Sequence, residues 1–380
     1  MSSLRGTNRT ASRTVTVAWW IAVAAGVVIA PFYLDAIWLQ DGLFAMAAAI
    51  GAIGLNLLTG ATGQLSMGHA FFLAVGAFGY VYFASEPGEE FGGLGLPTPL
   101  AAVLAVLLAG VAGGVFSPIA GRLKGAYLGI ATLALIFIGH FVMSNATPVT
   151  GGHNGRPVPP MELFGFAFTD TPEPLVVAGV PFGALERLWF LGVAALVCAG
   201  LFARGVLRGR PGRAMNTIRD HEIAAGVMGV PVTRYRAGVF VLSSMYGGLA
   251  GVLIALVFRQ TVPDYFSLIL ALSYLAMIII GGLGSVAGAV VGAFFVSMLP
   301  SLFTRYSDAL PLVAPPGQEG IGAAEAAQIL YGLAVVVVVL FLPGGLFGLF
   351  TQARLRLTRR TPSASPAQPS LTPTPEARNG

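Results

Sequence analysis

The sequence is poor in charged residues. Only 10% of its 380 residues are charged, whereas 56% are hydrophobic and the mean hydropathy is +0.80. A soluble domain carries about a quarter charged residues, so this chain lacks the polar surface needed to cover a globule of its length. About 20 apolar residues cross a bilayer as a helix, and apolar runs of that length recur along the chain. The sequence therefore predicts an all-α polytopic membrane protein.

Several catalytic and ligand-binding patterns are missing as well. Cys198 is the single cysteine, which excludes an intrachain disulfide, and no His or Cys cluster has metal-ligand spacing. The single lysine, Lys124, is followed by Gly125 rather than by Ser or Thr, so the chain has no phosphate-binding loop. We expect no cofactor in this chain, and any ATP must be bound by partner subunits. The basic residues are spread through short loops, where they would set the membrane topology. We therefore expect the protein to contact a lipid bilayer and to bind no nucleic acid.

Acidic residues are absent from the middle of the apolar runs. Those nearest to the runs fall at their ends or in loops, at Asp35, Asp41, Asp264, Asp308 and Glu325. Proton-coupled carriers usually titrate a carboxylate inside the membrane. The pattern favours a helical pore or carrier. Its energy would come from a partner chain, or from the gradient of an ion that backbone carbonyls bind.

The apolar runs predict ten candidate spans, of which we expect eight to ten to cross the membrane. They are 16–34, 42–59, 65–84, 99–118, 126–145, 188–204, 237–257, 266–283, 286–304 and 327–349. Glycines interrupt the span at 266–283, and a re-entrant pair there would lower the count. Of the 21 Lys and Arg residues, 17 fall in alternate segments on one side, and the positive-inside rule assigns that side and both termini to the cytoplasm.

The predicted topology divides the chain into three parts. They are a cytoplasmic segment at 1–15, a transmembrane domain at 16–350 and a cytoplasmic tail at 351–380. The tail is rich in Pro, Ser, Thr and Ala and should be disordered. Within the domain we expect a cytoplasmic loop at 205–236 and two longer extracytoplasmic loops at 85–98 and 146–187, which either dock a partner or only connect spans.

Local signals in the cytoplasmic loop predict a short helix. Asp220 is suited to cap its first turn and Gly229 to end it. A helix of about two turns would then lie across the cytoplasmic face, with Ala224 and Ala225 forming a small-residue surface that another protein could approach closely. A solvated basic loop that only fixes topology is the alternative.

Polar residues also gather around the junction of the second and third spans. They are Asn56, Thr59, Gln64, Ser66 and His69. Such side chains are costly at membrane depth unless they pair with another helix or line a wet cavity. Glycines at 54, 60, 63 and 68 allow a backbone break whose freed groups could meet a polar solute. We predict that this segment lines a translocation path; a close-packed helix pair is the alternative.

Both segments resemble branched-chain amino acid ABC transporter permeases, and in particular their M-type subunits. The resemblance rests on the sequence at 218–225 with Gly229, on 54–68, and on 123–127, 150–155 and 280–285, and it covers roughly residues 42–350. In ABC importers generally, a Glu-Ala-Ala with a Gly further on docks on the ATPase. Here Ile223 occupies the Glu position and Glu222 precedes it, an arrangement similar to the branched-chain subfamily's own version.

The resemblance implies a transporter subunit that is not an enzyme. It implies a multi-pass protein of the bacterial cytoplasmic (inner) membrane that works with two ABC ATPase subunits, a second homologous permease and an extracytoplasmic solute-binding protein. The expected ATPase-coupling residues are Asp220, His221, Glu222, Ala224, Ala225 and Gly229. A urea or short-amide ABC permease and a gradient-driven secondary carrier stay open as alternatives.

Overall fold

The computed structural model describes residues 26–88, 91–123, 125–170, 175–177, 180–306, 320–341 and 345–348. The expectations for the N-terminal segment 1–15 and for the tail 351–380 lie outside these residues, as does most of the predicted first span, of which 26–33 are helical. The longer helices are α2 (Ala36–Thr62), α3 (His69–Ala84), α4 (Thr98–Arg122), α5 (Ala126–Asn145), α7 (Ala184–Arg208), α8 (Arg210–Asp220), α10 (Val232–Phe258), α11 (Leu268–Gly281), α12 (Val286–Arg305) and α13 (Ala323–Phe341). The shorter ones are α6 (Thr147–Thr150), α9 (Glu222–Val227), η1 (Gly152–Asn154) and η2 (Pro263–Phe266).

Six of the described helices are long and apolar enough to cross a membrane, namely α2, α4, α5, α7, α10 and α12. Shorter apolar helices lie at His69–Ala84, Leu268–Gly281 and Glu325–Val338. The glycine-interrupted span is the helix α11, and at a rise of about 1.5 Å per residue it is shorter than the hydrocarbon core. The prediction of an all-α polytopic membrane protein is confirmed.

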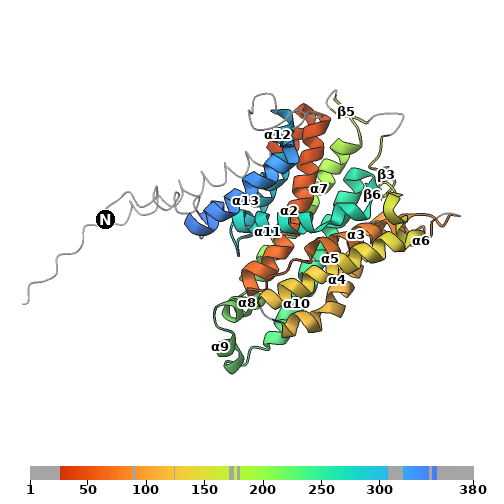
Figure 1. Cartoon of the computed structure of the whole chain (residues 1–380). Coiled ribbons are helices and arrows are strands. Elements are labelled where there is room, and N and C mark those ends of the chain that lie inside the picture. Colours follow the sequence, from red (N-terminus) through yellow and green to blue (C-terminus); the bar gives the residue numbers. More distant parts are fainter. Residues whose placement is uncertain are drawn as a thin grey trace, which may run out of the picture.

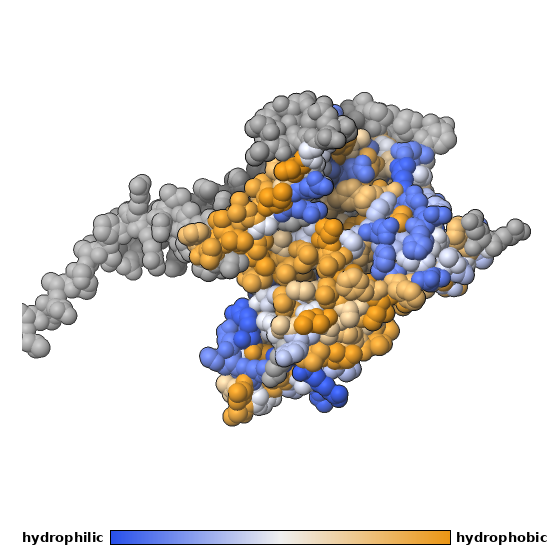
Figure 2. Space-filling view, in the orientation of Figure 1, coloured by the Kyte–Doolittle hydropathy of each residue, from blue (hydrophilic) through white to orange (hydrophobic). Residues whose placement is uncertain are grey.

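Two helices form the centre of the bundle. The most apolar stretch of α2 is 89% buried and that of α10 is 78% buried, against 33% or less for the other four long helices. Around them pack α3, α4, α7, α11 and α12 (Figure 1). The outward faces of the peripheral helices are hydrophobic, as Figure 2 shows over α4 and α5, which is the surface that lipid or another membrane helix would cover.

Glycines allow the central helices to approach closely. A Cβ at Gly54 would overlap Tyr246, and one at Gly251 would overlap the backbone oxygen of Leu73. Small residues at such contacts let helix backbones pack without a hydrophobic driving force from water. The central core is therefore held by close packing between α2, α3 and α10.

The two ends of the bundle differ in character. One end carries α8 and α9, and the other carries short antiparallel strand pairs and loops (Figure 1). The pairs are β1 (Arg156–Pro157) with β6 (Gln260–Thr261), β2 (Glu162–Leu163) with β3 (Phe166–Ala167), and β4 (Leu175–Val177) with β5 (Val180–Phe182). We call the described parts of 85–98, 146–183 and 259–267 the outer layer, because the charge pattern predicts that they lie on the extracytoplasmic side.

The outer layer is one packed unit and not a set of separate connections. The Arg156 guanidinium donates to the backbone oxygens of Gly92 (2.8 Å) and Val149 (2.9 Å), which joins the two predicted extracytoplasmic loops. The Tyr80 hydroxyl donates to the Pro159 carbonyl at 3.0 Å and fastens this layer to α3. The loops therefore form a structured surface at that end.

Candidate coupling and translocation site

The predicted cytoplasmic loop folds into two consecutive helices. Because α8 runs as far as Asp220, this residue ends α8, and His221 is the residue that precedes the first turn of α9. The predicted capping role of Asp220 is therefore wrong; its carboxylate instead pairs with Arg219 at 3.0 Å. The predicted role of Gly229 in ending the helix is confirmed, since Gly229 has φ 81° and the N–H groups of Gly229 and Val230 bond to the Gly226 and Ala225 carbonyls.

The exposed surface of α9 combines large apolar side chains with small residues. Ala225 is fully buried, so its expected exposure is wrong, whereas Ala224 and Gly226 are exposed. Ile223 and Val227 are 86% and 85% exposed, and Met228 is 78% exposed. The first two lie on one face because four residues separate them. Figure 2 shows hydrophobic residues at this tip of the molecule, bordered by hydrophilic ones.

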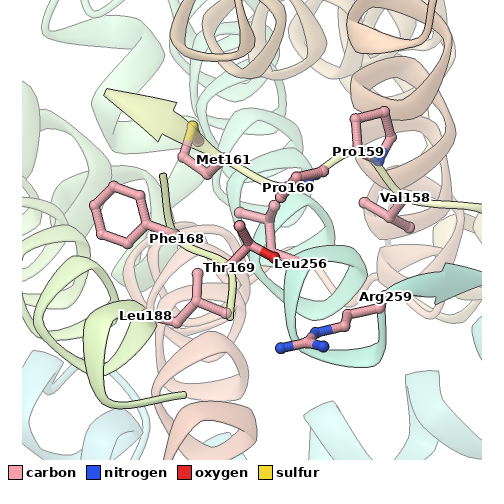
Figure 3. A pocket seen from close by; sticks show the side chains of 9 residues that line it. All are labelled: Val158, Pro159, Pro160, Met161, Phe168, Thr169, Leu188, Leu256 and Arg259. Carbon is pink, nitrogen blue, oxygen red and sulfur yellow. The ribbon is translucent and has the colours of Figure 1, made fainter. Parts of the chain in front are cut away.

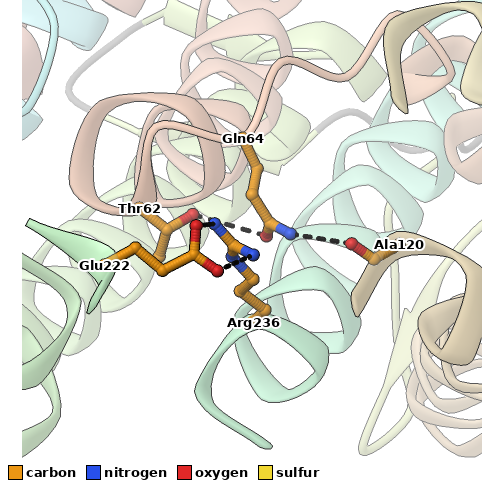
Figure 4. A network of polar contacts seen from close by, with 5 residues as sticks. All are labelled: Thr62, Gln64, Ala120, Glu222 and Arg236. Carbon is orange, nitrogen blue, oxygen red and sulfur yellow. Dashed lines mark hydrogen bonds and ion pairs between the residues drawn. The ribbon is translucent and has the colours of Figure 1, made fainter. Parts of the chain in front are cut away.

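A buried ion pair ties α9 to α10. The Arg236 guanidinium donates to both carboxylate oxygens of Glu222, at 2.9 Å and 3.1 Å (Figure 4). The Arg236 side chain is only 9% exposed and that of Glu222 is 29% exposed. Two parallel charge-assisted bonds fix both distance and orientation. The ion pair therefore joins the first residue of α9 directly to the second turn of α10.

Neighbouring polar groups join the ends of α2 and α4. The Gln64 side-chain amide donates to the Ala120 carbonyl at 3.0 Å, and the Thr62 hydroxyl lies 3.4 Å from the Gln64 oxygen (Figure 4). Arg219 of α8 donates to the Gly60 carbonyl of α2 at 2.9 Å. These side chains connect the end of α2 with α4 and α8, while the ion pair connects α9 with α10.

Asn56 links α2 to the turn between α11 and α12. Its side-chain nitrogen donates to the Ser285 carbonyl (2.8 Å), and its oxygen accepts from the Gly284 N–H (2.8 Å). Gly284 has φ 79°, which only glycine adopts without cost. Asn56, which was expected to line the path, is therefore 3% exposed and satisfied by backbone groups.

The remaining predicted path residues lie inside the bundle. Ser66 and His69 are 3% and 2% exposed. Among the described residues, the Thr59 hydroxyl and the His69 Nε2 atom have no hydrogen-bond partner. The His69 ring lies edge-on to Tyr274 of α11, with centroids 5.2 Å apart, and the buried Tyr274 hydroxyl is equally without a partner in the described part of the chain. His69 and Tyr274 therefore bring two unpaired polar atoms close together inside the bundle, whereas Thr59 lies near the end of α2.

Sequence reasoning missed three residues of this site. Arg219 and Arg236 lie in the predicted cytoplasmic loop without a role of their own, and Tyr274 lies within the predicted span 266–283. The spacing of 14 residues between Glu222 and Arg236 carries no periodic signal, so the fold alone reveals that pair. A lone tyrosine inside an apolar run is the one sequence signal that could have drawn attention to Tyr274.

The outer layer contains a small cavity of about 90 Å³. Figure 3 shows its lining residues, which are Val158, Pro159, Pro160, Met161, Phe168, Thr169, Leu188, Leu256 and Arg259. Beside it, Arg259 pairs with Asp170 at 2.8 Å. This hydrogen bond from Arg259, with a second from the Ala184 N–H, holds the pKa of Asp170 below its usual value. No cluster of His, Cys, Asp and Glu that could hold a metal ion occurs among the described residues.

These features define a class of protein. Glycine-packed apolar helices, buried polar groups and a short exposed helix at one end define a polytopic helical membrane protein. The family described as "Branched-chain amino acid transport system / permease component" matches residues 42–342. The chain belongs to this family, and the resemblance seen in its sequence motifs is confirmed.

Individual relatives agree with this assignment. The chain is 29% identical over 339 residues to the "High-affinity branched-chain amino acid transport system permease protein LivM" of Salmonella typhimurium, covering 86% of this chain and 73% of that protein. It is 24% identical over 248 residues to the "Probable branched-chain amino acid transport permease protein LivM" of Methanocaldococcus jannaschii, covering 65% and 67%. It is 22% identical over 161 residues to the corresponding permease protein LivH of Salmonella typhimurium, covering 42% and 46%.

Proposed function

We propose that this chain is the membrane permease subunit of an ABC importer for branched-chain amino acids in the bacterial inner membrane. Its partners would be a second, homologous permease, two cytoplasmic ATPase subunits and an extracytoplasmic solute-binding protein. Similarity to both LivM and LivH proteins supports a pair of homologous permeases. The observation that carries the proposal is the exposed helix α9, joined through Glu222 and Arg236 to the central helix α10.

The tip of α9 would be the ATPase docking surface. Ile223, Val227 and Met228 expose most of their apolar surface to solvent, which is costly unless a partner covers it. Their host is a helix of six residues held at both ends, by the ion pair at Glu222 and by the turn at Gly229. A groove on the ATPase that receives this tip would move α9 as a rigid body.

The ion pair would pass that motion to the spans. Arg236 is the fifth residue of α10, and α10 packs against α2, α3 and α4 along its length. Arg219 provides a second connection, from α8 to the end of α2. Movement of the coupling segment would therefore change how α2 packs against α10, and α2 borders the candidate path.

The path itself would run past the polar groups between α2, α3 and α11. Buried polar atoms without partners are rare in folded proteins because each costs free energy. Thr59, His69 and Tyr274 provide such atoms in this structure, so these groups would meet the amino acid or water when the helices separate. Asn56 and Gln64 would instead hold the surrounding backbone in place, since both already have partners.

The test is uptake by the reconstituted complex. The chain is purified with its partner permease, ATPases and binding protein, placed in vesicles, and supplied with labelled leucine or labelled urea. We expect leucine uptake that requires ATP and the binding protein, and no urea uptake. Urea uptake would support the short-amide alternative. Leucine uptake driven by a sodium or proton gradient in vesicles without ATPase chains would support a secondary carrier and overturn the proposal.

A further inference from the structure

A strained turn on the outer layer presents a fully exposed aromatic ring. Phe164 and Gly165 connect β2 to β3, and Phe164 has a relative exposure of 102%. Its φ is 50°, in the left-handed region, where a residue with a Cβ pays a steric cost. Two-residue hairpin turns with both central residues in this region favour Asn-Gly or Gly-Gly. Phe164 therefore destabilises the fold through backbone strain, and its exposed ring buries no apolar surface that would offset this cost.

The hairpin that carries this ring is held firmly on both sides. The Thr98 hydroxyl accepts from the Glu162 N–H at 2.7 Å and donates to the Glu162 carbonyl at 3.0 Å. On the other side, the Arg187 guanidinium donates to the Ala167 carbonyl at 2.8 Å and lies over the Phe166 ring, 5.1 Å from its centroid. These contacts hold the backbone on either side of Phe164 in place before any partner arrives, which lowers the entropy cost of binding.

Charges around the hairpin favour a protein partner over lipid. Glu162, two residues before Phe164, is exposed, whereas Arg187, which contacts the hairpin, is 6% exposed and donates to backbone oxygens. Within the hairpin itself, residues 162–167, Glu162 is the one charged residue, and its carboxylate repels anionic lipid headgroups. An apolar pocket with a basic rim on a water-soluble protein is complementary to this surface.

We propose that Phe164 is the anchor by which the permease docks the extracytoplasmic solute-binding protein, with Glu162 facing a basic residue at the rim of the receiving pocket. Exposed aromatic residues commonly dominate binding energy at interfaces. Strain at an exposed position is expected where function requires the residue. The inference rests on the proposed function, because that function supplies the partner.

The test compares two variants in the full complex. F164N removes the ring, which should weaken binding of the solute-binding protein. It also places a residue that tolerates the left-handed region, which should stabilise the fold. F164W keeps an aromatic ring and the strain. We measure ATPase stimulation against the concentration of loaded binding protein, together with the melting temperature. For F164N we expect a half-saturating concentration about tenfold higher and a melting temperature equal to or above that of the wild type. F164W should half-saturate near the wild-type concentration.

Three results would overturn the inference while the wild type remains active. They are half-saturation of F164N within about twofold of the wild type, a lower melting temperature of F164N that accompanies the lost stimulation, and loss of the second permease from the purified F164N complex. The last result would assign the ring to a membrane partner. A wild-type complex that shows no stimulation would instead remove the proposed function, and this inference with it.

Discussion

Breaking the ion pair between Glu222 and Arg236 tests the coupling segment most sharply. The pair has two bonds of 2.9 Å and 3.1 Å, and the Arg236 side chain is 9% exposed. A hydrogen bond to a charged group contributes about 1.5 to 3 kcal/mol, and solvent screening at Glu222, which is 29% exposed, reduces the sum. We expect the pair to contribute about 2 kcal/mol of stabilising free energy. This corresponds to about a 30-fold change in the equilibrium between α9 packed on α10 and α9 detached from it.

A double-mutant cycle measures this interaction. E222Q, R236M and the double variant are compared in the reconstituted complex for the free energy of unfolding and for leucine transported per ATP hydrolysed. In each single variant the free energy of unfolding should fall by about 2 kcal/mol, and less leucine should be transported per ATP. In the double variant the free energy of unfolding should fall by less than the sum of the two single losses. D35N is the matched control, because the pair of Asp35 with Arg305 is exposed, lies at the other end of α2 and contributes little. Strictly additive losses, or single variants with wild-type transport per ATP, would refute the reasoning.

Three further variants test other parts of the structure. Y274F removes a hydroxyl that has no described partner, so transport should slow without loss of stability, whereas Y246F breaks a 2.7 Å bond and should cost about 1 kcal/mol of stability with transport unchanged. G251A on α10 should cost about 2 kcal/mol in a denaturant titration, because its Cβ overlaps backbone, whereas G238A on the same helix meets open space and should be neutral. D170N should abolish the acid sensitivity of the outer layer, measured by hydrogen exchange. Because the folded pKa of Asp170 is lowered, its stabilisation is fully present above about pH 4 and is lost as pH falls through the lowered value.

Each of these expectations has a contrary result. Equal transport rates in Y274F and the wild type would remove Tyr274 from the path. Equal stability of G251A and G238A would show that α3 and α10 separate more easily than their contact implies. Acid sensitivity that persists in D170N would assign it to another group.

The long helices could be predicted from the sequence because hydropathy summed over about 20 residues is a strong signal. The predicted spans 99–118 and 237–257 lie inside α4 and α10. Both helices extend further, to Thr98–Arg122 and Val232–Phe258, because their polar ends lie beyond the apolar run that the prediction follows. Helix ends depend on caps and neighbours that hydropathy does not report.

The contacts within the site could not be predicted in the same way. Asn56 meets Gly284 and Ser285 across more than two hundred residues of chain, and a helix such as α2 has no local signal for that contact. Ala224 and Ala225 are adjacent and identical in type, yet Ala225 alone is buried. Which of them points inward depends on how α9 packs, and a helix of six residues is too short for a periodic pattern to decide it.

The central claim is that this chain works as one permease of an ABC importer. Its most direct test is purification of the chain from the native membrane in mild detergent, followed by mass spectrometry of the intact complex. The account predicts one copy of this chain together with a second permease and two ATPase chains, and loss of the ATPase chains when Ile223 and Val227 are replaced by aspartate. Recovery of this chain alone, or only as an oligomer of itself, would contradict the account and make α9 an ordinary connecting helix.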